Sequence, residues 1–216
     1  DIFDKSNYLS KKKIVLCLFG IIPRSIKKTI SSIKTRIINV LKEHKCEVKI
    51  YIFSLITNSK IDKVTINYKD IDLINYDFKE EMLQSKLDLM FNSISKYPYE
   101  KKLLLDYYNN KSTLNNCFRQ LYSEYRVGCF LEKNLSNFDG AIVCGPDYFF
   151  SRYLSTIDLK DSITNNRVYT SKVNDSHGYT NGYYLGDLKK LVPILKRLTN
   201  LKKCLDINKQ KNYDYE

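Results

Sequence analysis

The stretch Lys13-Ile14-Val15-Leu16-Cys17-Leu18-Phe19-Gly20 decides the fold class of this 216-residue chain. An apolar run without polar alternation is typical of a strand covered on both faces, as in a parallel sheet. The segment after Gly20 predicts a helix, which Ser25 can cap, packed on that sheet. Its apolar residues recur at spacings of four, three, four and four: Ile26, Ile30, Ile33, Ile37 and Leu41.

The remaining pattern continues this alternation of strands and helices. Strands are expected at Glu47–Leu55, Lys63–Tyr68, Asp139–Gly145, Arg167–Thr170 and Asn181–Leu185, and helices at Lys79–Ser95, Thr113–Lys133 and Asp187–Leu198. The order strand, helix, strand implies a right-handed parallel crossover. We therefore expect an α/β fold with a mostly parallel central sheet flanked by helices. One domain would span residues 13–199, between a flexible arm (1–12) and a polar tail (200–216).

Composition narrows the class of protein. Hydrophobic residues make up 43% and charged residues 28%, which argues against disorder as the main state. The net charge of +12 suits an anionic partner: nucleic acid, a phosphorylated ligand or an acidic membrane surface. Scattered lysines in a chain rich in Lys, Asn, Ile and Tyr equally fit a compositional bias.

The cysteines and apolar runs indicate the compartment. None of the six cysteines shows C-x-x-C spacing, so neither a zinc site nor a redox motif is expected. Several lie in apolar runs, as free thiols do in a reducing compartment. The run Ile14–Ile22 is too short to span a bilayer, and no secretory signal is evident. We expect a cytoplasmic protein without a transmembrane segment.

Two strand ends carry candidate ligand-binding residues, because open parallel sheets bind ligands beyond the carboxyl ends of their strands. After the first strand, Gly20 allows close approach of a backbone, and Arg24 offers a fixed fork of donors to phosphate. After the later strand, Asp147 must face a crevice, a cation or a metal ion. The alternative for the turn at Gly20 and Arg24 is an ordinary strand–turn–helix connection without a ligand. The alternative for Asp147 is an aspartate that caps a turn.

Two further stretches hold polar residues that could serve a site. The loop Asn174–Gly182 contains Asp175 and His177, and a neutral imidazole can act as a metal ligand or a general base. On the predicted long helix, Arg119, Tyr122 and Ser123 are spaced to share one face. Alternatively, His177 is an ordinary histidine of a surface loop, and the polar residues of the long helix lie on its exposed side.

Four segments together resemble small GT-A-type glycosyltransferase domains of large DNA viruses of the chlorella-virus kind. The segments are Arg24–Lys27 with Thr29–Ile33, Asn116–Ser123, Phe138–Val143 leading to Pro146-Asp147, and either Asn174-Asp175 or Asn181–Gly186. Their shared order spans residues 13–198. The resemblance implies a GT-A-like fold with a Rossmann-like nucleotide-binding half, a UDP-sugar donor and a glycan or glycoprotein acceptor, with a viral protein acting in the host cytosol.

The resemblance also implies roles for individual residues. Asp147 would hold Mn²⁺ (or Mg²⁺), and Asp175 or His177 would lie near the sugar or acceptor as a base. Contacts to the nucleotide-sugar are implied for Gly20, Arg24, Ser25, Arg119, Tyr122, Ser123, Pro146 and Tyr148. The family's Asp-x-Asp is reduced here to Gly145-Pro146-Asp147, so metal binding would either be weaker or need a helper such as His177. Asp70-Ile71-Asp72 matches Asp-x-Asp literally but follows a less clearly buried strand.

These observations predict a metal-dependent transfer of sugar from a UDP-sugar to a hydroxyl acceptor. The metal and arginine would stabilise the leaving diphosphate. One alternative is a basic module that binds single-stranded nucleic acid, favoured by the charge and the 18 tyrosines; no nucleic-acid motif is present, so nucleic acid is not the expected partner. Another is a catalytically inactive nucleotide-sugar binder, favoured by the reduced acidic motif.

Overall fold

The computed structural model describes residues 8–57, 66–93, 111–171 and 182–200. Within these ranges the chain forms one six-stranded sheet with helices on both faces. The strands are β1 (Lys13–Gly20), β2 (Glu47–Ile56), β3 (Phe78–Leu83), β4 (Gly140–Cys144), β5 (Val168–Thr170) and β6 (Tyr183–Gly186). The α-helices are α1 (Ile22–Ile33), α2 (Asn39–Glu43), α3 (Gln84–Ser93), α5 (Lys111–Lys133), α6 (Thr156–Thr164) and α7 (Leu188–Leu195). A π-helical turn η2 (Lys34–Ile38) and two 3-10 helices, η3 (Tyr68–Leu73) and η4 (Arg197–Asn200), complete them.

The sheet is mostly parallel, as the sequence predicted. Its strand order is β3-β2-β1-β4-β6-β5. The pairs β2–β3, β1–β2 and β1–β4 are parallel, and β6 runs antiparallel to both β4 and β5. The carboxyl ends of β1, β2, β3, β4 and β5 therefore lie at one edge of the sheet, which we call the carboxyl edge.

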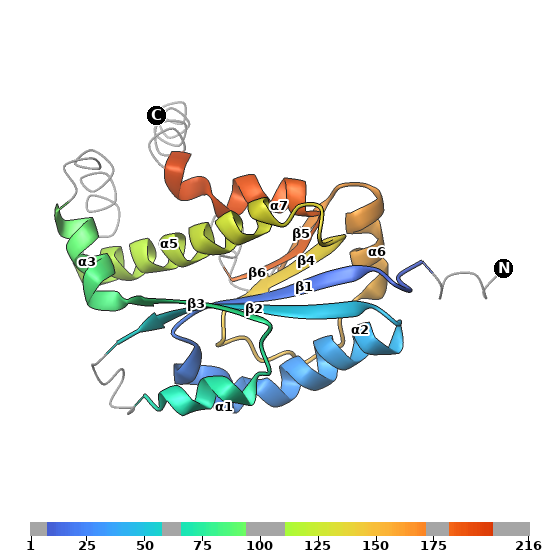
Figure 1. Cartoon of the computed structure of the whole chain (residues 1–216), viewed down its shortest axis with the longest axis horizontal. Helices are drawn as coiled ribbons and strands as arrows, with labels where there is room; N and C mark the ends of the chain where they lie inside the picture. Colours follow the sequence, from blue (N-terminus) through green and yellow to red (C-terminus); the bar gives the residue numbers. More distant parts are fainter. Residues whose placement is uncertain (1–7, 58–65, 94–110, 172–181, 201–216) are drawn as a thin grey trace, which may run out of the picture.

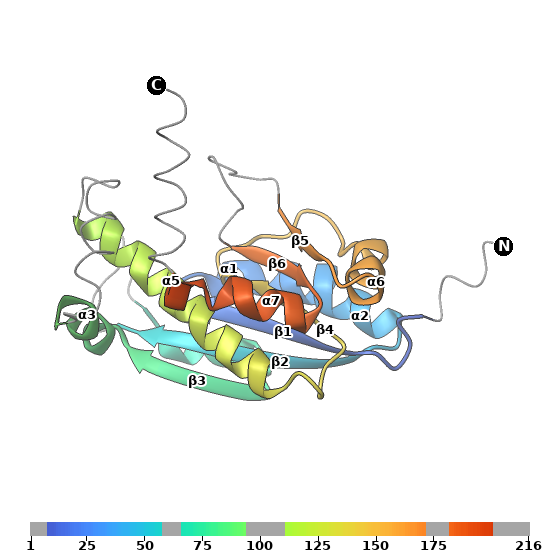
Figure 2. The same cartoon turned by 90° about the horizontal axis from the view of Figure 1, so that it is seen from above.

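Each face of the sheet is covered by its own layer of helices (Figures 1 and 2). α1, α2 and α6 lie on one face, and α3, α5 and α7 lie on the other. Alternate residues of β1 divide between the two cores: Leu16 packs under α1, whereas Cys17 packs under α5 and α7. Because both faces of β1 are buried, its sequence is a continuous apolar run.

The chain crosses from one side of β1 to the other at a defined place. From β1 it passes through α1, η2 and α2 to β2 on one side. After β3, α3 and α5 it returns to form β4 on the other side of β1. The carboxyl ends of β1 and β4 thus mark the topological switch point, where ligands bind in open α/β sheets.

The segment that leaves β4 runs along α1 and η2 before α6 begins. We call residues 145–155 the strap. Thr29 Oγ1 donates to the carbonyl of Pro146 at 2.7 Å, Phe150 N donates to Ser32 Oγ at 3.1 Å, and Leu154 N donates to the carbonyl of Arg36 at 2.9 Å. These three helix positions are separated by about one turn each, so the strap follows one side of the helix.

The third strand and the start of the first helix differ from expectation. In the described part of Lys63–Tyr68 the chain is irregular and then enters η3, whose N-terminus is capped by Asn67. The third strand is β3, where the sequence predicted the beginning of a helix at Lys79–Ser95; α3 starts only at Gln84. Ser25 does not cap α1, because the helix begins at Ile22 with Pro23 in its first turn. The helix α6 was not predicted.

Candidate functional site

Arg24 and Asp147 meet at the switch point. Arg24 lies in the first turn of α1, just past β1, and Asp147 lies in the strap, three residues past β4. Arg24 Nη2 donates to Asp147 Oδ2 in an ion pair, and both side chains are partly exposed. The structure therefore brings together the two residues singled out at separate strand ends, which are 123 positions apart in the sequence.

The backbone around this pair is tightly arranged. Gly20 has a φ of +114°, a conformation that other residues rarely adopt, and this turn starts α1 directly after β1. A side chain at Gly20 would lie 3.7 Å from Cδ of Pro146, so the two strand ends are in contact. Thr29 of α1 fixes Pro146 through its carbonyl. The relative position of Arg24 and Asp147 is thus set by both strands and by α1.

The N-terminus of α1 adds positive potential beside Arg24. The residue before the helix, Ile21, provides no side-chain cap, and the first turn holds no acidic residue. Pro23 occupies the first turn without cost, since an N–H there has no helical partner. Because the Arg24 amide donates to the carbonyl of Ile21 at 3.1 Å, the attraction for anions at this end comes from the dipole of α1 and not from a row of free N–H groups. Ser25 sits in the same first part of α1 and bonds through its carbonyl to Thr29.

Tyr148 closes the strap against β6. The amide of Gly145 donates to the carbonyl of Gly182 at 3.0 Å, and the Tyr148 ring packs on Gly182 so closely that a side chain there would overlap it. Burial, followed by the charges of Cys144, Asp147 and Glu124, raises the pKa of Tyr148. Tyr148 therefore stays a neutral phenol that can donate a hydrogen bond near the pair.

Arg119, Tyr122 and Ser123 make contacts within the layer of α3 and α5. Arg119 forms a bidentate ion pair with Asp88 of α3: Nε donates to Oδ1 at 2.8 Å, and Nη2 donates to Oδ2 at 2.6 Å. Tyr122 is buried with its ring centroid 6.1 Å from that of Phe53. Ser123 Oγ donates to the carbonyl of Arg119 at 2.7 Å. These contacts join α5 to α3 and to β2, and they do not involve Arg24 or Asp147.

Asp175 and His177 lie outside the described residues. The chain on either side of their segment is described, and it lies at the carboxyl edge: Ser171 follows the end of β5, and Gly182 is hydrogen-bonded to Gly145. Asp70 and Asp72, the literal Asp-x-Asp, lie in η3, which packs on α1.

A buried ion pair lies in the core near the carboxyl edge and was not foreseen. Glu124 of α5 is fully buried, and its Oε2 lies 2.5 Å from Nη2 of Arg197, although no hydrogen bond of standard geometry reaches that oxygen. Gln120 donates to its other oxygen at 3.1 Å, and Arg197 also reaches the Tyr184 hydroxyl at 3.3 Å. Burial raises the pKa of Glu124 to about 7, although Arg197 and Gln120 lower it. The sequence does hold a signal for this pair: Glu124 lies three residues after Leu121 and seven before Leu131, so it falls on the buried side of the helix.

The described residues do not by themselves form a metal site. In the described ranges, no group of three or more His, Cys, Asp or Glu side chains is arranged to hold an ion. Asp147 is occupied by Arg24. A divalent cation bound by protein usually has one or two carboxylates plus ligand phosphates or waters. At this edge the observed arrangement is a carboxylate paired with an arginine.

No protein-family model matches this chain, and no curated protein is significantly similar to it. Among the helices in the described ranges, none has the length and hydropathy to cross a bilayer.

Proposed function

We propose that this protein is a glycosyltransferase that binds the diphosphate of a nucleotide-sugar, of the UDP type, at the carboxyl edge between β1 and β4. The observation that carries the proposal is the meeting of Arg24 with Asp147 at the switch point, beside the uncapped start of α1. An arginine fork and a helix N-terminus are two independent sources of attraction for phosphate.

Asp147 orients Arg24 in this proposal. A guanidinium has five N–H donors, so the bond from Nη2 to Asp147 leaves donors for an incoming phosphate. The ion pair holds the long arginine side chain in place, which reduces the entropy lost when the ligand binds. Partial exposure of both side chains leaves the pair accessible from solvent.

The proposed reaction is group transfer at the anomeric carbon of the donor sugar. The acceptor hydroxyl oxygen forms a bond to this carbon while the bond to the diphosphate oxygen breaks, and the electron pair leaves with the diphosphate. Arg24 and the N-terminal dipole of α1 stabilise the charge that develops there. The proton of the acceptor hydroxyl passes to a base, for which Asp175 and His177 are the sequence-based candidates.

The Mn²⁺ or Mg²⁺ cofactor is supported only by the likeness of Pro146-Asp147 to the family's acidic motif. Asp147 belongs to no larger group of possible metal ligands within the described residues. In this proposal Arg24 and the N-terminus of α1 neutralise the charge of the leaving diphosphate. Binding of UDP measured with and without Mn²⁺ tests the cofactor separately.

Isothermal titration with UDP and UDP-sugars tests the site. We expect Arg24→Gln to weaken UDP binding at least tenfold, since charge-assisted bonds contribute about 1.5–3 kcal/mol. Arg167→Gln is the matched control, because Arg167 is also paired with an aspartate but lies at the other end of β5. Equal affinity of wild type and Arg24→Gln, or no binding of any UDP compound, would remove the site from this edge.

A binder that does not transfer the sugar is the second candidate. It is favoured by the single carboxylate at Asp147, which is engaged by Arg24. Donor turnover distinguishes the two: UDP binding without release of UDP from any UDP-sugar, in the presence of acceptor glycans, would assign the binding role alone.

A further inference from the structure

Three large apolar side chains stand out from the surface close to one another in the chain. The exposed fractions are 69% for Phe149, 65% for Tyr153 and 78% for Ile157. Phe149 and Tyr153 belong to the strap, and Ile157 lies in the first turn of α6. We call these three residues the apolar rim. Large apolar side chains clustered on a surface mark an interaction site more often than scattered ones do.

The rim is held rigidly by its backbone and does not extend from a loose loop. The residues next to Phe149 and Tyr153 in sequence, Phe150 and Leu154, donate their amides to Ser32 and to the carbonyl of Arg36. These two positions are one helical turn apart, so the backbone of the strap follows one side of α1 and η2 where it carries Phe149 and Tyr153. The Tyr153 ring stacks on the guanidinium of Arg36, 4.0 Å from its centroid.

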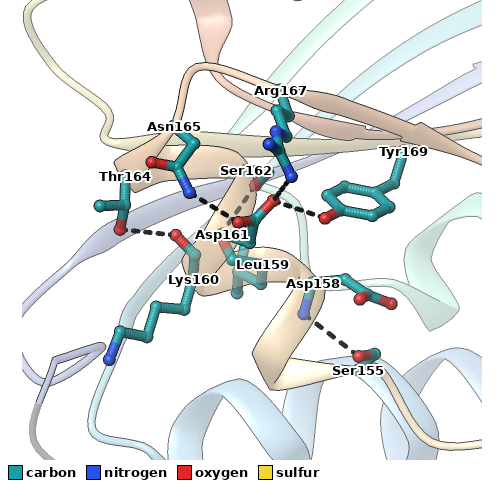
Figure 3. Close-up of polar contacts among 10 residues, drawn as sticks. All are labelled: Ser155, Asp158, Leu159, Lys160, Asp161, Ser162, Thr164, Asn165, Arg167 and Tyr169. Atoms are coloured by element: carbon teal, nitrogen blue, oxygen red, sulfur yellow. Dashed lines mark hydrogen bonds and ion pairs between the residues drawn. The ribbon is translucent and has the colours of Figure 1, made fainter.

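The helix that carries Ile157 is fixed as firmly (Figure 3). Asp161 accepts hydrogen bonds from the Tyr169 hydroxyl at 2.5 Å and from Asn165 Nδ2 at 2.7 Å, and pairs with Arg167 at 3.3 Å. Ser155 caps the helix by accepting from the amide of Asp158 at 3.2 Å. Ile157 is therefore presented at a constant position relative to the strap.

The helical run beside the rim is strongly basic. Residues 22–43, which comprise α1, η2 and α2, include six basic side chains and one acidic one, for a net charge of +5. Lys27, Lys28 and Lys34 are exposed, and Arg152 of the strap is exposed next to Tyr153. The strap and α6 (residues 145–164) contain two basic and three acidic side chains, so the charge that attracts anions lies on the helical run beside the rim.

We infer that this face docks on a membrane surface that contains anionic lipids. Exposed aromatic and aliphatic side chains can enter the headgroup region, where tyrosine places its ring in the apolar zone and its hydroxyl in water. Basic residues near an anionic leaflet contribute about 1 kcal/mol each. Ile157 distinguishes this occupant from single-stranded nucleic acid, whose bases stack on aromatic rings and gain little from an aliphatic side chain.

Co-sedimentation with vesicles tests the apolar contribution. The probes are vesicles of phosphatidylcholine alone and of phosphatidylcholine with about 30% phosphatidylserine, a composition chosen to give a negative surface potential. We expect the wild type to bind only the second kind. The double variant Phe149→Ser/Ile157→Ser should bind about tenfold or more weakly, because each buried CH₂ contributes about 0.8 kcal/mol. Leu89→Ser is the control, since Leu89 is 68% exposed but lies on α3, over the opposite face of the sheet.

Two further variants, which have the same net charge as each other, test whether binding depends on the basic residues of this face. Lys27→Glu/Lys28→Glu on α1 should lower vesicle binding by about 30-fold or more, because two basic contacts are lost. Lys189→Glu/Lys190→Glu on α7 makes the same change on the opposite face, where both lysines are also exposed, and should bind like wild type. Thermal unfolding of each variant verifies that it is folded.

Three results would overturn the inference. Wild type that does not bind the phosphatidylserine vesicles excludes the membrane surface. Equal losses for the α1 and α7 variants assign binding to net charge and not to this face. Tight binding of a single-stranded oligonucleotide that prevents vesicle binding and is lost in Lys27→Glu/Lys28→Glu assigns the face to nucleic acid. None of these measurements uses a sugar donor, so the inference is tested separately from the proposed transferase activity.

Discussion

The buried pair of Glu124 and Arg197 gives a prediction about stability and pH. Burial raises the pKa of Glu124 from 4.5 to about 7 in the folded protein. Between these values the folded state binds more protons than the unfolded state, so the free energy of unfolding falls as the pH rises. A shift of this size corresponds to roughly 3 kcal/mol, at about 1.4 kcal/mol per unit. Burying Glu124 in its protonated form thus stabilises the fold most below the unfolded pKa, and this contribution is lost as the pH rises to about 7, where the carboxylate ionises beside Arg197.

Replacement of Arg197 by methionine should make this dependence steeper. At pH 5 Glu124 is protonated in the folded state of both proteins, and the variant should lose about 1 kcal/mol with the contact to Tyr184. At pH 8 wild-type Glu124 is ionised beside Arg197, whereas the variant must bury an unpaired charge or retain a proton. Leaving one partner of a buried pair alone costs about 3–5 kcal/mol.

Urea denaturation of both proteins at pH 5, 6, 7 and 8 measures the difference. Comparing the variant with wild type at each pH cancels the other titrating groups. Arg167→Met is the control, because the Arg167 side chain is 63% exposed and its ion pair with Asp161 should contribute little at any pH. If Arg197→Met were destabilised equally at pH 5 and pH 8, Glu124 would not be a buried group that titrates between these values.

Three further predictions concern the fold. Gly20→Ala should lower the free energy of unfolding by about 1–3 kcal/mol, because φ of +114° is strained for alanine, and urea denaturation measures it; an unchanged midpoint would exclude this backbone conformation. Ile26→Ala should cost about 2–5 kcal/mol in the same assay, since the side chain is fully buried under the sheet, and a loss below 1 kcal/mol would place α1 elsewhere. Hydrogen bonds from Tyr169 and Asn165 lower the pKa of Asp161, so the stability that this carboxylate contributes is present above its unfolded pKa and is lost on acidification. Asp161→Asn should therefore lower the thermal midpoint more at pH 7 than at pH 3. An equal loss at both pH values would contradict this.

The sequence predicts the centre of the sheet because burial there leaves a simple pattern. β1 and β4 are covered on both faces and are continuous apolar runs, and β2 has such a run at its centre, Ile50–Phe53. The long helix α5 and the short strands β5 and β6 were likewise confirmed. The pairing of β1 with β4 depends on tertiary packing and cannot be read from the sequence. The convergence of Arg24 and Asp147 could still be proposed, because each residue follows a buried strand.

The edge strand β3 could not be predicted in this way. Its sequence Phe-Lys-Glu-Glu-Met-Leu lacks an apolar run, because an edge strand has one free side and its polar residues find local partners. Glu80 accepts from the Tyr51 hydroxyl and pairs with Arg126 of α5, so its place depends on residues distant in sequence. The contact of Arg119 with Asp88 likewise depends on how α3 packs against α5.

The π-helical turn η2 has a consequence for how the strap is attached. In this turn the amide of Asn39 bonds to the carbonyl of Lys34, five residues back, where an α-helix would use the fourth. Such a turn amounts to one residue inserted into an α-helix, and here the carbonyl of Arg36 within it accepts the amide of Leu154. Excision of one residue from Lys34–Ile38 would give a more regular helix but would rotate every later side chain by about 100° relative to the sheet. The π-helical turn therefore lets one helix orient its apolar side chains toward the sheet and, at the same time, the carbonyl of Arg36 toward the strap.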